Sequence, residues 1–180
     1  MDRQLIAGTS PFEPIVGYSR AVRVGTHVYV SGTTATDATG RIVGTGDHGA
    51  QARQCLANIG AALERAGARF ADVVRTRIYV TDIGQWEAVG KAHAECFAQV
   101  RPACTMVEVA RLAAPEMLVE IEVDAVIGSG RAPHGRARAT ASAGNGEGDG
   151  GAVKAIPQAR PRGTRPAKPR PRTKAQRRAR

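Results

Sequence analysis

Two segments close to residue 115 alternate apolar and polar side chains with a period of two, and this pattern restricts the folds open to the chain. The segments run from Thr105 to Arg111 and from Leu118 to Ile127, and a turn that contains Pro115 separates them. Strict alternation is typical of strands with one buried face, and two such strands joined by a turn predict a β-hairpin.

One face of the second segment is apolar throughout and is interpreted as core: Val119, Ile121, Val123, Ala125 and Ile127. The opposite face mixes carboxylates with apolar side chains: Leu118, Glu120, Glu122, Asp124 and Val126. In the first segment, Cys104 and Met106 are predicted to share the face of Glu120. Because a plain solvated face would not favour carboxylates beside Met106 and Leu118, we expect function on this mixed face.

The composition of the chain changes abruptly near Gly128. Residues 1–128 carry 12 lysines and arginines against 14 acidic residues, whereas residues 129–180 carry 14 against two, so the net charge of +10 comes from the C-terminal part. That part holds six of the ten prolines and no aromatic residue, and it cannot bury enough surface to offset chain entropy. We therefore expect one domain at 1–128 and a disordered basic tail at 129–180.

The three cysteines, Cys55, Cys96 and Cys104, are odd in number and lack the spacing of a metal site. The sequence shows neither an N-terminal apolar signal segment nor an apolar run of the roughly 20 residues that a membrane span needs. A soluble protein of the reducing cytoplasm is expected. The four histidines share no spacing typical of metal ligands, so no metal site is predicted.

Pro11 and Pro14 predict an irregular segment over residues 1–16. Two short alternating runs follow at residues 18–25 and 27–31, separated by a turn signal, and they predict a hairpin. Two pairs of valines are expected to meet in the core of this hairpin: Val22 and Val24 with Val28 and Val30.

Residues 32–48 are rich in Gly, Thr and Asp and predict a loop with a short strand at residues 41–43. An amphipathic helix follows and is expected to end at Gly67, with an apolar stripe of Ala52, Cys55, Leu56, Ile59, Ala62, Leu63 and Ala66. A strand at Val73–Thr81 leads to a second helix at Gly84–Gln99, whose stripe is Trp86, Val89, His93, Cys96 or Phe97, and Val100. Two helices on one face of a mostly antiparallel sheet of five or six strands define a two-layer α+β domain.

The two helices cover only one sheet face, so the mixed face needs another partner. It is predicted to carry side chains of opposite charge that pair across strands: Glu108, Glu120, Glu122 and Asp124 with Arg23, Arg75 and Arg77. Four larger side chains are interleaved with them: Tyr29, Tyr79, Met106 and Leu118. We expect this face to pack against symmetry-related copies of the chain.

Several motifs stand in a fixed order: YSRAVRVG at 18–25, VSG at 30–32, the helix that ends near Gly67, VTD at 80–82, and RPACTMVEVARL at 101–112 followed by VEIE at 119–122. Their order and spacing resemble the YjgF/YER057c/UK114 superfamily, the reactive-intermediate (Rid) deaminases, also described as L-PSP endoribonuclease-like. The resemblance covers about residues 3–128. It implies a homotrimer of chorismate-mutase-like α+β subunits with three clefts between neighbouring subunits.

The best-known members of that superfamily hydrolyse enamine and imine intermediates to 2-oxo acids and ammonia without a metal or organic cofactor. In those members an arginine directly after a Pro-Ala pair binds the substrate carboxylate, for which its planar fork of donors is suited. This chain has Cys104 at that position, so activity on the usual small imino acids is in question. Arg101 would substitute only if the turn bends it inward.

The resemblance and the strand pattern together predict a cleft lined by Tyr18, Ser31, Gly32, Cys104, Met106 and Glu120. Glu120 either activates a water molecule or pairs with Arg75 or Arg77 across a subunit boundary. Cys104 is interpreted as a small lining residue rather than a nucleophile, because no histidine is evidently placed to favour its thiolate. Tyr18 either contacts substrate or packs at the edge of the domain.

The predicted function is hydrolytic deamination of an imine, an enamine or a related small metabolite by water held in the cleft. Two alternatives stay open: a non-catalytic trimer that binds a small metabolite, and an RNA-interacting protein aided by the basic tail. Residues 160–180 would bind nucleic acid by salt-sensitive counterion release, but the lack of aromatic residues for base stacking favours an extension without a partner.

Overall fold

The structure is a computed structural model that describes residues 2–130. Its strands within this range are β1 (Arg3–Ile6), β2 (Ala21–Val24), β3 (His27–Thr34), β4 (Val73–Val80), β5 (Ala103–Glu108) and β6 (Val119–Val126). Its helices are α1 (Phe12–Val16), α2 (His48–Arg65) and α3 (Trp86–Phe97), with short 3-10 turns η1 (Phe70–Asp72) and η2 (Ile83–Gln85). The predicted disordered tail lies, from residue 131 onward, outside the described residues.

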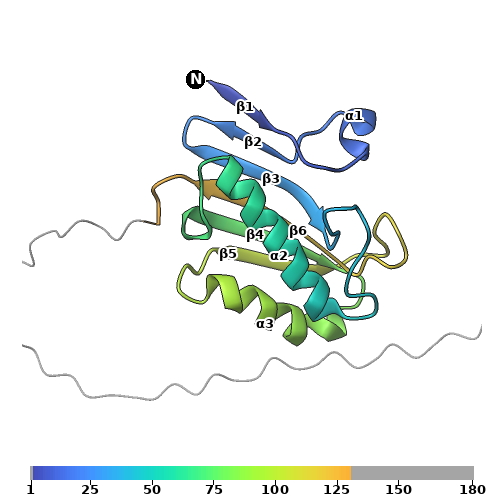
Figure 1. Ribbon diagram of the computed structural model, residues 1–180. Coiled ribbons are helices and arrows are strands. Elements are labelled where there is room, and N and C mark those ends of the chain that lie inside the picture. The colour runs from blue at the N-terminus through green and yellow to red at the C-terminus, as the bar shows by residue number, and fades with distance from the viewer. Residues whose placement is uncertain (1, 131–180) are drawn as a thin grey trace, which may run out of the picture. The chain divides into compact units, whose positions relative to one another are not determined.

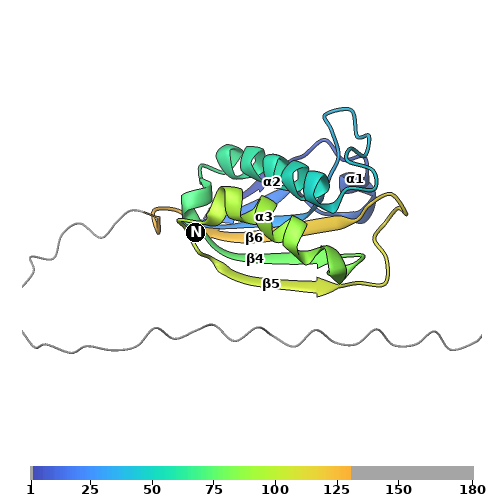
Figure 2. The same ribbon diagram turned by 90° about the horizontal axis from the view of Figure 1, so that it is seen from below.

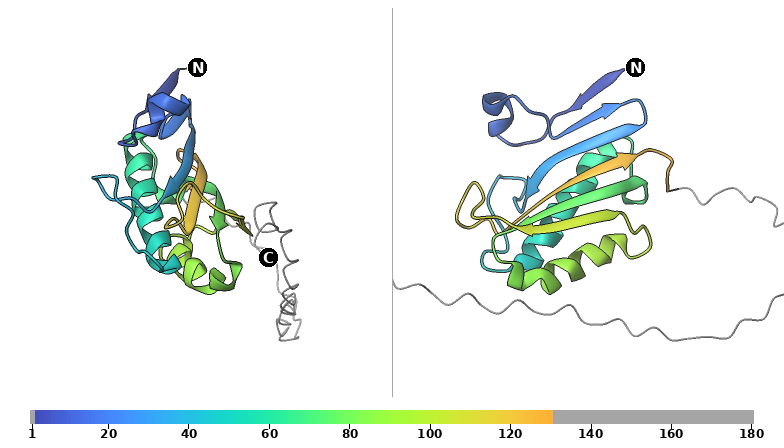
Figure 3. Two further views of the ribbon diagram at one scale, coloured as in Figure 1. Left: turned by 90° about the vertical axis from the view of Figure 1, so that its right-hand side faces the viewer. Right: turned by 180° about the vertical axis from the view of Figure 1, so that it is seen from behind.

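The six strands form one sheet in the order β1-β2-β3-β6-β4-β5. Neighbouring strands run antiparallel except β4 and β5, which are parallel. Helices α2 and α3 lie on one face of the sheet (Figures 1 and 2), and the right panel of Figure 3 shows the other face without a helix over it in residues 2–130. The predicted two-layer α+β domain is confirmed.

The core lies between the sheet and the two long helices. Both predicted apolar faces are buried there, with Val119, Ile121, Val123 and Ala125 from β6 and Cys55, Leu56, Ile59, Ala62 and Leu63 from α2. Burying one such large aliphatic side chain contributes about 1.5–3 kcal/mol. In α3, Val89 and Phe97 are buried as predicted, but Trp86 is 56% exposed because it begins the helix, outside its packed stripe.

Helix α2 begins and ends where side chains satisfy its terminal backbone groups. Asp47 caps its start by accepting a hydrogen bond from the N–H of Ala50 at 2.9 Å. At its end, Nη1 of Arg23 donates to the carbonyl of Ala66 at 2.9 Å. Gly67 then takes a φ of +78°, which glycine adopts without strain. The predicted helix and its glycine terminator are confirmed.

The predicted hairpin between the last two strands is wrong, because β4 lies between β5 and β6. The chain leaves β4, crosses through α3 and adds β5 outside β4 in parallel. Residues 109–118 then return past the end of β4 to reach β6, and they are tied there by the N–H of Val109 to the carbonyl of Val80 at 2.8 Å. Alternation identifies two strands, but it does not reveal a third strand inserted between them.

The first half of the sheet requires three further corrections. Residues 1–16 are not irregular throughout: β1 pairs with β2, and α1 tolerates Pro14 because the first turn of a helix has spare N–H groups. The predicted valine pairing is wrong, since Ala21 and Arg23, not Val22 and Val24, lie opposite Val30 and Val28. The short strand expected at residues 41–43 is reduced to a single bridge between Thr36 and Ile42.

Within residues 2–130, no helix combines the length and the apolar character that crossing a membrane would require.

Candidate functional site

The sheet face opposite helices α2 and α3, called the bare face below, has a hollow at the end where β6 begins. The hollow has a volume of about 330 Å³ and is lined by Gly32, Tyr79, Val109, Arg111, Leu112, Glu120 and Glu122. A larger hollow of about 400 Å³ at the β1–β2 edge is lined by Asp2, Gln4, Arg23 and Gly25. We assign the candidate site to the smaller one, because two predicted site residues, Gly32 and Glu120, line it.

Glu120 is the half-buried carboxylate of this hollow. It lies opposite Tyr79 of β4 and Thr34 of β3, on the face of the sheet turned away from the helices. Burial raises the pKa of Glu120, the nearby charge of Glu122 raises it further, and the positive charge of Arg20 opposes the shift. A carboxyl group with a raised pKa is suited to carry a proton in both directions.

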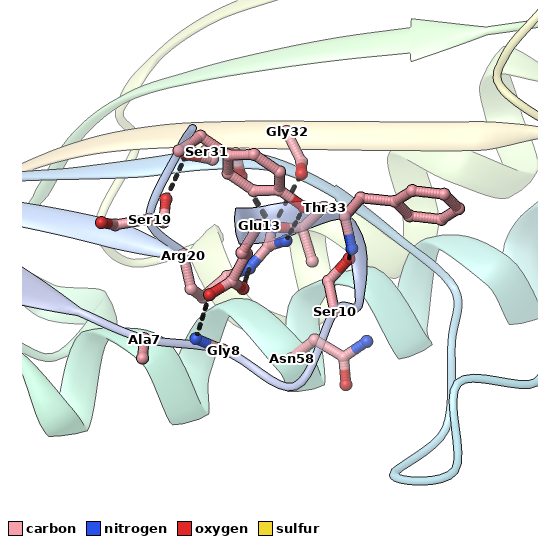
Figure 4. A network of polar contacts seen from close by, with 12 residues as sticks. Ala7, Gly8, Ser10, Glu13, Ser19, Arg20, Ser31, Gly32, Thr33 and Asn58 are labelled. Atoms are coloured by element: carbon pink, nitrogen blue, oxygen red, sulfur yellow. Dashed lines mark hydrogen bonds and ion pairs between the residues drawn. The ribbon is translucent and has the colours of Figure 1, made fainter. Parts of the chain in front are cut away.

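Arg20 joins three of the predicted site residues into one network (Figure 4). Its Nη1 donates to the carbonyl of Gly32 at 2.8 Å and lies 3.5 Å from that of Ser31. Its Nη2 donates to the hydroxyl of Tyr18 at 3.4 Å, and the guanidinium lies 5.6 Å from the centre of the Tyr18 ring. Arg20 therefore fixes the β3 backbone beside the hollow, where the β3–β6 register shifts between Val30 and Thr33.

The segment around α1 between β1 and β2, called the N-terminal arm below, contacts Arg20 through Glu13. Glu13 of α1 is only 10% exposed and approaches Nε of Arg20 to 3.9 Å through Oε1. Its other carboxylate oxygen accepts the N–H of Gly8 at 2.8 Å, as Figure 4 shows. The arm that the sequence predicted to be irregular thus contributes the counter-ion that holds the network in place.

A second polar cluster ties down the other carboxylates of the bare face. Arg77 donates to Glu122 and to Asp124, each at 3.1 Å. The hydroxyl of Tyr79 donates to Glu122 at 3.1 Å, and burial together with this bond raises the pKa of Tyr79. Arg77 therefore pairs with Glu122 and Asp124, and this ion pair leaves the carboxylate of Glu120 facing the hollow.

The structure separates the six predicted site residues into two groups. Tyr18, Ser31, Gly32 and Glu120 come together, with Arg20 and the backbone of β3 linking them. Ser31 also has a structural role: its hydroxyl donates to the carbonyl of Ser19 at 2.8 Å and links β3 to the segment before β2.

Cys104 and Met106 form the second group, and their predicted place on the face of Glu120 is wrong within one subunit. Cys104 lies beside Thr76 and Met106 beside Ile78 in the parallel β4–β5 pair, and both of these β4 residues are buried under the helices. Thr76 in turn hydrogen-bonds Nε2 of His93 at 3.1 Å, and burial lowers the pKa of that imidazole. The error follows from the hairpin prediction, which paired β5 directly with β6.

The predicted set omits the polar residues Arg20, Tyr79, Arg111 and Glu122, and it also omits Val109 and Leu112 of the hollow. The signal for Arg20 was its spacing of two from Tyr18, which places both side chains on the same side of an extended segment. Arg111 gave no comparable signal, because the predicted strand reaches it, whereas β5 ends at Glu108 and the strand period does not apply beyond that residue. No three potential metal-ligating side chains among residues 2–130 lie close enough to share an ion.

These features define an α+β subunit with a candidate site on its bare sheet face. Residues 8–127 match the family model described as Endoribonuclease L-PSP. The chain belongs to this family, which confirms the resemblance that the motifs indicated.

Relatives cover the same part of the chain. A RutC family protein of Pyrococcus abyssi is 36% identical over 126 residues, 69% of this chain and 98% of the relative. A protein named 3-aminoacrylate deaminase RutC, from Acinetobacter baylyi, is 36% identical over 114 residues, 63% of this chain and 88% of the relative.

Solved structures agree with this assignment. A YjgF/YER057c/UK114 family member from Mycobacterium tuberculosis is 51% identical, with a TM-score of 0.64 and coverage of 70% of this chain and 100% of its own. The YjgF gene product of E. coli is 33% identical, with a TM-score of 0.61 and coverage of 68% and 98%. The fold class derived from the sequence is that of these structures.

Proposed function

We propose that this protein hydrolyses the C=N bond of a small imine or enamine, with Glu120 moving the protons. The observation that carries the proposal is the half-buried Glu120 carboxyl, which has a raised pKa and faces a hollow of about 330 Å³. The relative named 3-aminoacrylate deaminase supports the class of reaction, since 3-aminoacrylate is itself an enamine.

The proposed reaction adds water to the carbon of a protonated imine. Ionised Glu120 takes a proton from the water as its oxygen bonds to that carbon and the π electrons move to nitrogen. Protonated Glu120 then gives this proton to the nitrogen, and the C–N bond breaks as the carbinol oxygen forms the C=O bond. The departing ammonia takes up the hydroxyl proton, so that ammonium and a carbonyl compound are released and Glu120 is again ionised.

Cys104 and Met106 enter this proposal as residues of a neighbouring subunit. In one subunit they lie on the helix side of β5, whereas Glu120 lies on the bare side of β6. The resemblance implies a homotrimer with clefts between subunits, and β5 is an edge strand whose Cys104 is exposed. The trimer predicts a mass in light scattering of three times the 18.9 kDa of one chain; a monomeric mass at micromolar concentration would contradict it.

The test generates 2-iminobutanoate or 2-iminopropanoate in situ and follows its decay with the wild-type protein, Glu120→Gln and Cys104→Arg. We expect wild-type acceleration, and a loss of about 10²- to 10⁴-fold in Glu120→Gln, the usual contribution of a general acid–base. If the wild type accelerates none of several imines, the non-catalytic alternative takes the place of this proposal. If only Cys104→Arg is active, the wild-type reaction lies elsewhere.

A second proposal concerns the basic segment at residues 129–180, with 14 lysines and arginines against two acidic residues. Such a charge favours nonspecific nucleic-acid binding that weakens steeply with salt. Mobility shifts of RNA with the full chain and with residues 1–130 test this. Equal binding by the two proteins would remove any role of the segment.

A further inference from the structure

We propose that Arg111 binds an anionic group of the substrate, a carboxylate, at the rim of the hollow that Glu120 faces. The inference rests on the proposed function and adds to it the residue of this chain that holds the acid group of the substrate. Three observations support it, namely the position of Arg111, its lack of another partner, and the charge balance of the hollow.

The position of Arg111 follows from the path of the chain after β5. The N–H of Val109 donates to the carbonyl of Val80 at 2.8 Å, which fixes the start of the segment that crosses the end of β4. Val109, Arg111 and Leu112 of this segment then line the hollow together with Glu120. Within residues 2–130, Arg111 is the only cationic side chain among the lining residues.

The other arginines near the hollow are already engaged. Arg20 binds two backbone carbonyls and lies against Glu13, and Arg77 is shared between Glu122 and Asp124. Arg111 is exposed and makes no side-chain hydrogen bond or ion pair with any other residue in the range 2–130. Within one subunit its guanidinium is therefore available to a ligand, and its planar fork of donors matches a carboxylate.

The carboxylates that line the hollow do not prevent an anion from binding. Glu122 accepts hydrogen bonds from Arg77 and from the hydroxyl of Tyr79, so its charge is compensated within the sheet. The positive charge of Arg20 acts on the half-buried carboxyl of Glu120 and partly offsets its negative charge. Among the residues that line the hollow, Arg111 supplies the positive charge that attracts an anion.

Arg101 is the alternative cation, and the fold places it elsewhere. It lies two residues before Ala103, the first residue of β5, which pairs with Arg75 at the far end of β4. The hollow instead lies at the level of Tyr79, where β4 and β5 end. Arg101 therefore provides a matched control, as a second exposed arginine beyond the opposite end of β5.

The experiment measures binding and does not depend on turnover. Isothermal titration calorimetry with the full chain compares 2-oxobutanoate with its uncharged amide, 2-oxobutanamide, for the wild type, Arg111→Gln, Arg111→Lys and Arg101→Gln. Arg111→Gln should weaken 2-oxobutanoate binding about tenfold, the low end for a charge-assisted bond because the side chain is exposed. Arg111→Lys should retain part of the affinity, and Arg101→Gln should match the wild type.

Amide binding should be unchanged by every substitution. Equal carboxylate affinity in Arg111→Gln and wild type, an equal loss for the amide, no measurable 2-oxobutanoate binding by wild type, or a loss only in Arg101→Gln would each overturn the assignment. The outcome is separable from that of the proposed function: carboxylate binding that depends on Arg111 without imine turnover removes the deaminase proposal alone. Turnover that is unaffected in Arg111→Gln removes the assignment of Arg111 alone.

Discussion

The carboxylate of Glu120 packs against the backbone of Gly32, in the space that a side chain at residue 32 would occupy. A Cβ atom built on Gly32 would lie 2.9 Å from Cδ of Glu120 and closer still to its Oε1. Gly32 therefore serves as more than a turn residue, because its missing side chain determines where the carboxylate can sit. The β3–β6 register shift next to Gly32 brings the two residues together.

Gly32→Ala should displace Glu120 and lower the rate of imine hydrolysis. A shift of about 1 Å in a catalytic group costs roughly 100-fold in rate, so we expect a loss of that order in kcat. Gly90→Ala is the control, because a Cβ at Gly90 of α3 would meet no atom within 4 Å. It should leave activity unchanged and raise stability by about 0.5–1 kcal/mol, as alanine does in a helix. Equal activity of Gly32→Ala and wild type would contradict the packing argument.

Glu120→Gln should become more stable relative to the wild type as the pH rises. Burial raises the pKa of Glu120 in the folded state, so the folded chain holds this proton more tightly than the unfolded chain. Wild-type stability then falls as the pH rises from about 4.3, the ordinary glutamate value, through the raised pKa. Urea denaturation of both proteins at pH 4 and pH 7 measures the change. A stability difference that is independent of pH would show that the Glu120 pKa is not raised.

Local sequence patterns predicted most helices and strands, but they did not predict which strands lie next to one another in the sheet. The stripe of α2 and the buried face of β6 were both recognisable, because helical and strand periodicities are properties of single segments. Strand order depends on the path of the chain through α3. A crossover to the far side of β4 does not change the alternation of apolar and polar residues in β5, so the sequence does not reveal it. Cys104 was assigned to the wrong face for this reason.

The same limit explains why Arg20 was missed and why Arg23 was assigned to the wrong face of the sheet. A charged side chain that alternates with valines reads as solvent-facing, yet Arg23 points to the helix side and reaches the carbonyl of Ala66 at the end of α2. The side chain of Arg20 is only 14% exposed, and its partners include Glu13 of α1 and Gly32 of β3. Buried arginines are stabilised by contacts between distant segments, and one segment alone does not reveal them.

Gln51→Leu should destabilise the chain by about 2–3 kcal/mol, because it leaves two backbone groups unpaired in a buried environment. Gln51 is fully buried in α2; its Nε2 donates to the carbonyl of Glu116 at 2.7 Å, and its Oε1 accepts the N–H of Leu118 at 2.8 Å. These bonds hold the turn that leads to Glu120. Urea denaturation measures the loss, and the exposed Gln99→Leu should change stability by less than about 0.5 kcal/mol. Similar effects of the two substitutions would show that the Gln51 bonds do not hold the turn.

Mixing two inactive variants should restore activity if Glu120 and Cys104 meet only across a subunit boundary. Glu120→Gln removes the proton carrier, and Cys104→Trp fills the cleft from the edge strand of the neighbour. In a trimer reassembled from equal amounts of both, about a quarter of the sites would combine an intact Glu120 with an intact Cys104. Imine hydrolysis after joint unfolding and refolding should therefore return to about a quarter of the wild-type rate. Separately refolded variants, combined only afterwards, are the control and should stay inactive. The two residues lie on opposite faces of the sheet and cannot meet within one subunit, so recovered activity must come from sites shared by two subunits. No recovery in the co-refolded sample would exclude such a shared site.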